Sequence, residues 1–125
     1  MKIRLLLFAA LIIIWGCSQP LDCRKFKEGT FIIHDGEHTN IIRRSAGMQS
    51  ETLDTDKTVT FAVKWINDHT YTLTPQQDVF IKQPKLPRNA LMTVTITRTD
   101  SNFYTETTTT NFSGMSQTND VFKVD

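Results

Sequence analysis

The sequence predicts an all-β domain in which about eight short antiparallel strands form an up-and-down meander, curled into a small barrel or half-barrel. The first observation is the threonine content, because 19 of the 125 residues are threonine and most of them alternate with apolar or aromatic residues. β-Branched side chains fit a pleated strand, and alternation buries one face while it exposes the other. The second observation is the spacing of turn residues, which separate the alternating runs into successive hairpins. We therefore expect a sheet that curls to hide its edges.

The first 16 residues predict a signal peptide that precedes this domain. Lys2 and Arg4 give a positive start, and residues 5–15 form an unbroken apolar run. As a helix this run covers about 16 Å, roughly half the hydrocarbon core of a bilayer, so it is too short for a permanent span. Residues 14–17, Ile-Trp-Gly-Cys, resemble the bacterial lipobox, whose cysteine is acylated, with palmitate for example, and becomes the new N-terminus. These features predict a signal peptide at residues 1–16, a lipidated tether at 17–22 that begins with Cys17, and a single β domain at 23–125.

The residues after Cys17 predict where the anchored protein resides. Ser18 follows the lipidated position, and no acidic run comes after it. By resemblance to enterobacterial sorting rules, Ser18 favours the outer membrane over retention in the inner membrane. We therefore expect a cell-envelope protein that is attached to the outer membrane by its lipid and faces the periplasm.

The charge balance and the length exclude several classes of function. Without residues 1–16 the chain keeps 109 residues, with 12 basic against 13 acidic side chains. Nucleic-acid-binding domains carry a Lys/Arg-rich face, and this chain offers only short basic pairs such as Arg43-Arg44, which usually belong to a solvated surface, so we expect no nucleic-acid partner. A chain of this size has no room for a doubly wound cofactor domain, a (β/α)₈ barrel or a multi-part DNA-processing machine.

Alternation predicts four strands in the first half of the domain. The clearest case is residues 59–65, where four apolar residues occupy every second position. The dipeptide Asp35-Gly36 is the strongest hairpin signal in the sequence. The predicted strands cover residues 30–34, 39–44, 48–53 and 59–65.

The second half of the domain contains a long connection between strands. Residues 75–89 include three prolines and lack periodicity, and we expect one short element near residues 78–82. Residues 103–112 are polar on both faces, so their register is weakly specified. Before the first strand, residues 21–28 form a candidate helix from which Phe26 plugs one end of the barrel. The later predicted strands cover residues 70–74, 92–97, 103–112 and 121–124.

Motifs for catalysis or metal binding are not recognisable in the sequence. It contains no nucleophile elbow, glycine-rich phosphate loop or paired-cysteine motif, so we expect neither an enzyme nor a cofactor. His34 and His38 flank the Asp35-Gly36 turn and are weak metal-ligand candidates. Polar residues beside a turn are ordinary and no remote ligand is identifiable, so we expect no metal site.

Apolar residues of the predicted strands supply either a filled core or the lining of a ligand pocket. Small up-and-down barrels exist in both forms, some filled by side chains and some holding one small ligand. The short strands and the short chain favour the filled interior, and the aromatic content suits either alternative. The residues predicted to line the core or pocket are Phe31, Phe61, Val63, Trp65, Tyr71, Leu73, Met92, Val94 and Ile96.

Three segments resemble a group of small β-rich lipoproteins from Bacteroidetes with no established function. They are residues 23–31 (Cys-Arg-Lys-Phe-Lys-Glu-Gly-Thr-Phe), 42–44 (Ile-Arg-Arg) and 65–73 (Trp-Ile-Asn-Asp followed by Tyr-Thr-Leu). The resemblance covers most of the mature chain. Members often carry the label "DNA topoisomerase IV", but that activity requires a nucleotide site, a metal-binding acidic cluster and a large clamp. The resemblance therefore implies an envelope lipoprotein without topoisomerase activity.

The same resemblance implies a spatial pair of side chains. Relatives tend to carry a second cysteine just after the Asn-Asp turn, at the position that His69 occupies here. Cys23 and His69 are then expected to lie close together, with no disulfide and with Cys23 as an unpaired thiol in an oxidising compartment. The pair is either a metal or redox pair or the remnant of a former bridge. The second interpretation is favoured because zinc sites usually need at least three protein ligands.

A shorter resemblance bears on function. Gly29-Thr30-Phe31 is similar to the Gly-x-Trp opening of lipocalins, with phenylalanine in place of tryptophan, and implies a calycin-type barrel. The predicted function is therefore an accessory binding module of the periplasm, or a binding module for a small hydrophobic ligand. The alternative is a protein-interaction or structural component of the envelope with a filled barrel and no ligand.

Overall fold

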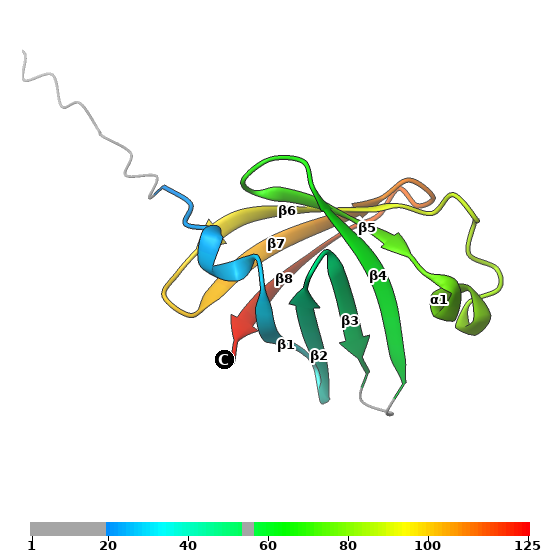
Figure 1. Cartoon of the computed structure of the whole chain (residues 1–125), viewed down its shortest axis with the longest axis horizontal. Helices are drawn as coiled ribbons and strands as arrows, with labels where there is room; N and C mark the ends of the chain where they lie inside the picture. The colour runs from blue at the N-terminus through cyan, green and yellow to red at the C-terminus, as the bar shows by residue number, and fades with distance from the viewer. Residues whose placement is uncertain (1–19, 54–56) are drawn as a thin grey trace, which may run out of the picture.

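Eight antiparallel strands follow one another in sequence order and close into a barrel, because β8 pairs with β1 as well as with β7 (Figure 1). This computed structural model describes residues 20–53 and 57–125. It confirms the predicted all-β meander and shows a closed barrel. The strands are β1 (Gly29–Asp35), β2 (His38–Ser45), β3 (Met48–Thr52), β4 (Thr58–Trp65), β5 (Thr70–Pro75), β6 (Met92–Thr99), β7 (Phe103–Thr110) and β8 (Ser116–Lys123).

Tight turns set the register of the first hairpins. Asp35 pairs with His38 across the predicted turn, where Gly36 has a φ of 61°. Ser45 pairs with Met48 across Ala46 and Gly47, whose φ values are 50° and 74°. Two successive residues with positive φ, as in the β2–β3 turn, or one glycine with positive φ at the first turn position, as in the β1–β2 turn, match the twist of a two-residue hairpin. The β1–β2 and β2–β3 pairings are thereby fixed by local backbone geometry.

One end of the barrel is closed by η1 (Arg24–Phe26), a single 3-10 turn that precedes β1 (Figure 1). Phe26 is fully buried there, and its ring lies 5.1 Å from that of Tyr104, so the predicted plug is confirmed. The predicted helix over residues 21–28 is wrong in extent, because only three residues are helical. A single turn, closed by a hydrogen bond from Phe26 N to Cys23 O, is enough to aim the ring inward. The core at this end consists of Cys23, Phe26, Phe31, Ile42, Ile96, Tyr104 and Val121.

The connection between β5 and β6 carries α1 (Gln77–Lys82), which confirms the short element predicted there. Its Val79 is buried against strand residues such as Val59 and Phe61. The carboxylate of Asp78 accepts hydrogen bonds from the backbone N and the Oγ1 of Thr60, at 3.1 and 2.7 Å. These contacts fasten the connection to β4. A second core cluster forms here from Val59, Phe61, Tyr71, Leu73, Val79 and Val94.

The last two strands correct the sequence analysis. β7 has two distinct faces, because Tyr104 and Glu106 are buried between more exposed threonines. Its register is set by pairing with β8 on one side and with β6 on the other, where the ladder shifts once between Ile96 and Arg98. β8 begins at Ser116, five residues before the predicted strand. Its first inward residues, Gln117 and Asn119, face a polar interior, so they give no apolar alternation to detect.

The predicted signal peptide at 1–16 and the lipidation site Cys17 lie outside the described residues. Within residues 20–53 and 57–125, no helix is long or apolar enough to cross a bilayer. The described part of the predicted tether includes Asp22, whose backbone N donates to Thr99 Oγ1 at 2.9 Å. The chain therefore enters the barrel at the end closed by η1.

Candidate functional site

A buried arginine organises the interior of the barrel. Arg44 on β2 is only 2% exposed, and its guanidinium makes four hydrogen bonds. Nε donates to Gln49 Oε1 at 2.8 Å and Nη1 to the carbonyl oxygen of Phe26 at 2.8 Å. Nη2 donates to the hydroxyl oxygens of Tyr71 at 2.8 Å and Tyr104 at 2.9 Å. These partners come from η1, β3, β5 and β7, so one side chain ties together four elements.

Aromatic rings complete the surroundings of the guanidinium. Its central carbon lies 4.9 Å from the ring centre of Phe31 and 4.6 Å from that of Tyr71. Burial opposes the charged form, but the tyrosine oxygens and Glu106 outweigh it and hold the pKa of Arg44 above its usual value. Paired and hydrogen-bonded buried charges are tolerated in protein interiors. Arg44 therefore stays charged inside the barrel.

Two hydrogen-bonded branches lead from Arg44 to carboxylates. In the first, Gln49 accepts from Arg44 and donates through Nε2 to Glu51 Oε1 at 3.0 Å. In the second, the Tyr71 hydroxyl accepts from Arg44 and donates to Glu106 Oε2 at 3.2 Å. Both carboxylates are thus oriented by the same cation without touching it. Neither branch was found by sequence reasoning.

Burial changes the protonation of these carboxyl groups. It raises the pKa of Glu106 from 4.5 to about 7, although Arg44 and the hydrogen bond from Tyr71 oppose the shift. The negative charge of Glu51 raises the pKa of Glu106 further. Burial also raises the pKa of Glu51, against the opposing effects of Gln49 and Arg44. Glu106 therefore changes charge near neutral pH.

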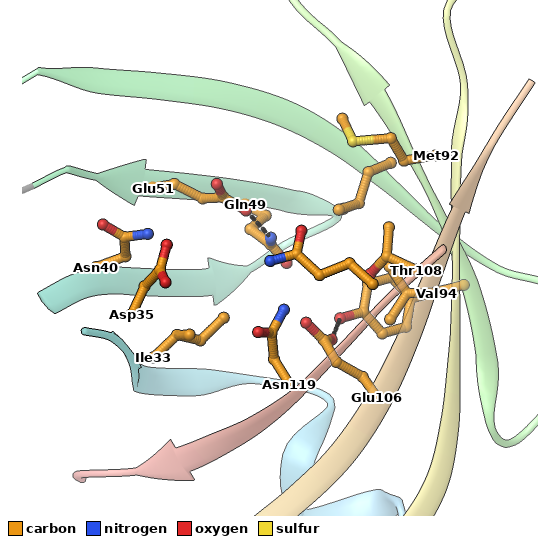
Figure 2. Close-up of a pocket in the computed structure, with 13 residues that line it drawn as sticks. Ile33, Asp35, Asn40, Gln49, Glu51, Met92, Val94, Glu106, Thr108 and Asn119 are labelled. Carbon is orange, nitrogen blue, oxygen red and sulfur yellow. Dashed lines mark hydrogen bonds between the residues drawn. The ribbon is translucent and has the colours of Figure 1, made fainter. Parts of the chain in front are cut away.

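Beyond this network the barrel encloses a cavity of about 180 Å³ (Figure 2). Asp35 and Asn40 lie at the β1–β2 hairpin and Gln117 near the start of β8, so the cavity extends away from η1 toward the opposite end. Tyr71 and Thr108 belong to the wall. The carboxylates in the lining are Asp35, Glu51 and Glu106, the amides are Asn40, Gln49, Gln117 and Asn119, and the apolar residues are Ile33, Leu73, Met92 and Val94.

The nine residues predicted to line the core or pocket are distributed over the two core clusters, a recess and the cavity. Phe31 and Ile96 fill the end next to η1, and Phe61 belongs to the cluster with Val79. Val63 and Trp65 are partly buried and border a recess near the β2–β3 turn. The cavity lining contains the remaining four, Tyr71, Leu73, Met92 and Val94.

The polar lining went unrecognised, although the sequence carries a signal for it. Alternation within β2 and β7 puts Arg44 on the same face as Ile42, and Glu106 on the same face as Tyr104. A charged residue at an inward position of an amphipathic strand marks a polar interior. Arg44 was instead interpreted together with Arg43 as an exposed basic pair.

Cys23 and His69 line the same pocket at the η1 end. Cys23 is a free thiol, only 5% exposed. Burial, followed by the negative charges of Asp22 and Asp68, raises its pKa, so the unreactive thiol form is favoured. The structure therefore gives Cys23 the surroundings of a structural cysteine.

The histidines beside the first turn lie on the β1–β2 hairpin. His34 pairs with Thr39 and His38 with Asp35 in the strand register, and His34 Nδ1 lies 3.4 Å from Thr39 Oγ1. Across residues 20–53 and 57–125, no group of three His, Cys, Asp or Glu side chains is arranged to hold a metal ion.

Comparison with known proteins found no matching family model, no similar curated protein and no similar solved structure. The function of the chain is therefore inferred from its own residues and geometry.

We predict that Arg44→Met destabilises the barrel strongly. The substitution removes the cation from a buried site and leaves the Phe26 carbonyl, Gln49 and the Glu106 branch without their shared donor. Breaking a buried ion network in this way costs about 3–5 kcal/mol. Urea unfolding followed by tryptophan emission measures the loss.

Arg43→Met is the matched control, because Arg43 is the exposed neighbour on the same strand. Surface substitutions usually change the unfolding free energy by less than about 0.5 kcal/mol. Equal losses for Arg43→Met and Arg44→Met would contradict the role assigned to Arg44.

We predict that Glu106 makes stability depend on pH in a defined direction. Its folded pKa of about 7 lies above the ordinary value of 4.5, so the folded state holds a proton that the unfolded state has released. The unfolding free energy therefore falls as pH rises from about 4.5 to about 7, by about 3 kcal/mol for this one group.

Glu106→Gln removes this contribution, so the pH profile of the variant is flatter than that of the unmodified protein. Denaturant unfolding at several pH values measures both profiles. Parallel profiles across this range would show that Glu106 titrates normally.

Proposed function

We propose that this protein is an envelope lipoprotein whose barrel is a small-ligand-binding module. The single observation that supports ligand binding is the cavity of about 180 Å³ inside the barrel, onto which carboxylates and amides converge. Protein interiors are close-packed, and a purely structural core leaves few voids larger than a water molecule. A cavity with convergent polar groups in an apolar wall is typical of a ligand site.

The size and lining of the cavity limit the ligand. A cavity of about 150 Å³ holds one benzene molecule, so this one suits a single ring or a short chain. Leu73, Met92 and Val94 offer an apolar wall, whereas Glu51 and Glu106 offer charge. The ligand therefore combines a small apolar part with a polar group, and is more polar than the hydrophobic ligand favoured by the sequence.

The lipid anchor completes the proposed architecture. Acylated Cys17 holds the chain on the periplasmic face of the outer membrane, and a tether through residue 22 leads to η1. Because the cavity extends away from η1, the anchor leaves its outer end free to receive a ligand. This part of the proposal depends on the apolar run at residues 5–15 and the lipobox-like Gly16-Cys17.

A second candidate function is docking of an envelope protein onto the loop that follows α1. Ile81 on α1 and Phe112 beside the loop are exposed. A hollow lies between residues 82–87 and Phe112. In-cell crosslinking from position 81 that captures no partner would count against this alternative.

We predict that protein purified from its own envelope carries a ligand in the cavity. Native mass spectrometry then shows an added mass that disappears on denaturation. Thr108→Trp fills the cavity and removes the added mass, because Thr108 belongs to its wall.

Thr107→Trp is the control, because Thr107 points the other way and its Oγ1 lies 3.1 Å from Thr118 Oγ1 on the exposed face. That variant keeps the added mass. Loss of the mass in both variants, or its absence from the unmodified protein, would contradict the proposed site.

We predict that Cys17→Ser abolishes membrane attachment. Each buried CH₂ of an acyl chain contributes about 0.8 kcal/mol, so two or three chains anchor a protein firmly and the hydroxyl variant has none. Cell fractionation shows the variant either soluble or accumulated as the uncleaved precursor. Mature-sized Cys17→Ser protein in the membrane fraction would refute the lipoprotein proposal.

A further inference from the structure

The cavity lining is charged with one sign only. It includes the carboxylates of Asp35, Glu51 and Glu106, and none of the described residues that line it is a lysine, arginine or histidine. The nearby cation, Arg44, lies behind the lining, where Gln49 and the other partners use four of its five N–H groups. Arg44 therefore orients the carboxylates, and the carboxylates are the charged groups that contact a ligand.

Glu106 has an oxygen that is open to the cavity. The side chain is only 6% exposed, and its Oε2 accepts the hydrogen bond from Tyr71 (Figure 2). Among the described residues no donor reaches its Oε1. In the same part of the chain, every fully buried side-chain oxygen or nitrogen has a partner, so Oε1 must be reached from the cavity. Glu106 is thus a buried carboxylate with one oxygen that a donor in the cavity can reach.

Other acceptors around the cavity are also available. Glu51 Oε1 is held by Gln49, and no donor from the described residues contacts its Oε2. The amides of Asn40 and Asn119 line the same space and make no hydrogen bond within the described chain (Figure 2). The carboxylates and the amide carbonyls together offer acceptors from several directions.

We infer that the cavity recognises a small organic cation, an amine whose protonated nitrogen donates to Glu51 and Glu106 while its short apolar part lies against Leu73, Met92 and Val94. This inference rests on the proposed function, because it names the ligand class of the same cavity. An ammonium group is a compact donor that matches several acceptors at once. A carboxylate or phosphate ligand would instead meet like charge without a free cation in the lining.

Protonation couples to binding in this arrangement. The charged or titratable groups that face Glu106 are Arg44 on β2, Glu51 on β3, Tyr71 on β5 and Tyr104 on its own strand. With a pKa of about 7, Glu106 in the empty cavity is partly protonated near neutral pH. A bound ammonium group favours the ionised carboxylate, so binding below this pH releases a proton.

Benzylamine, benzyl alcohol and benzoate test the inference as a matched set, because they share one ring and differ in charge. Isothermal titration at about pH 8 measures their affinities. Benzylamine is expected to bind about tenfold or more tightly than benzyl alcohol, since a hydrogen bond to a charged group supplies that difference. Benzoate is expected not to bind. At about pH 6, titration in buffers of different ionisation enthalpy shows proton release with benzylamine.

Three variants locate the effect. Glu51→Gln and Glu106→Gln each lower benzylamine affinity about tenfold or more and leave benzyl alcohol affinity unchanged, because the amide keeps the shape and loses the charge. Two variants keep the test valid if one fails to fold, and thermal unfolding checks each. Glu28→Gln is the control, since Glu28 is exposed at the η1 end, and it leaves both affinities unchanged.

The outcomes separate this inference from the proposed function. If benzyl alcohol or benzoate binds as tightly as benzylamine, cation recognition is wrong and the cavity remains a ligand site. If benzylamine affinity is equal in the two glutamine variants and the unmodified protein, the assigned carboxylates are wrong. If no probe binds and no retained mass is found, both the inference and the proposed function are overturned.

Discussion

The interior of this barrel depends on one buried charge. Arg44 lies against the aromatic rings of Phe31 and Tyr71, and four of its N–H groups are hydrogen-bonded to η1, β3, β5 and β7. An unpaired charge at this depth would be prohibitively costly, so each of these elements must hold its place for the network to form. Closure of the sheet and the seating of Phe26 are in this way linked to a single guanidinium. We therefore expect the network to specify the fold as well as to stabilise it.

The same network separates the barrel into two parts with different properties. On the η1 side, Phe26, Phe31 and Tyr104 fill the space with rings. On the other side, hydrogen bonds pass through Gln49 and Tyr71 to Glu51 and Glu106, which border open space. The sequence left a filled barrel and a hollow one open as alternatives, and this chain combines a filled end with a hollow end. The lipid tether is proposed for the filled end, which leaves the hollow end for function.

The fold was predictable from sequence wherever side chains alternated between water and an apolar core. Residues 59–65 and the Asp35-Gly36 turn gave clear patterns, and both are found as predicted. The patterns failed where the interior itself is polar. The first half of β8 was not predicted because its inward residues, Gln117 and Asn119, are polar. Arg44 was predicted to be exposed because it follows Arg43 in a basic pair. An inward polar residue is tolerated only if it has hydrogen-bond partners, and these can be distant in sequence, as Tyr104 is from Arg44. Local periodicity cannot reveal such partners.

The state of the Arg44 side chain tests this account most directly. Nitrogen-detected NMR resolves arginine Nε–H and Nη–H groups and measures how fast their protons exchange with water. Arg44 is expected to give separate N–H signals that exchange slowly with water, because rotation of its guanidinium is hindered. The N–H protons of exposed Arg43 are expected to exchange fast and to give a single averaged set of signals. Arg44 protons that exchange as fast as those of Arg43 would mean that the guanidinium is solvated. The network, the orientation of both carboxylates and the cavity they border would then have to be abandoned.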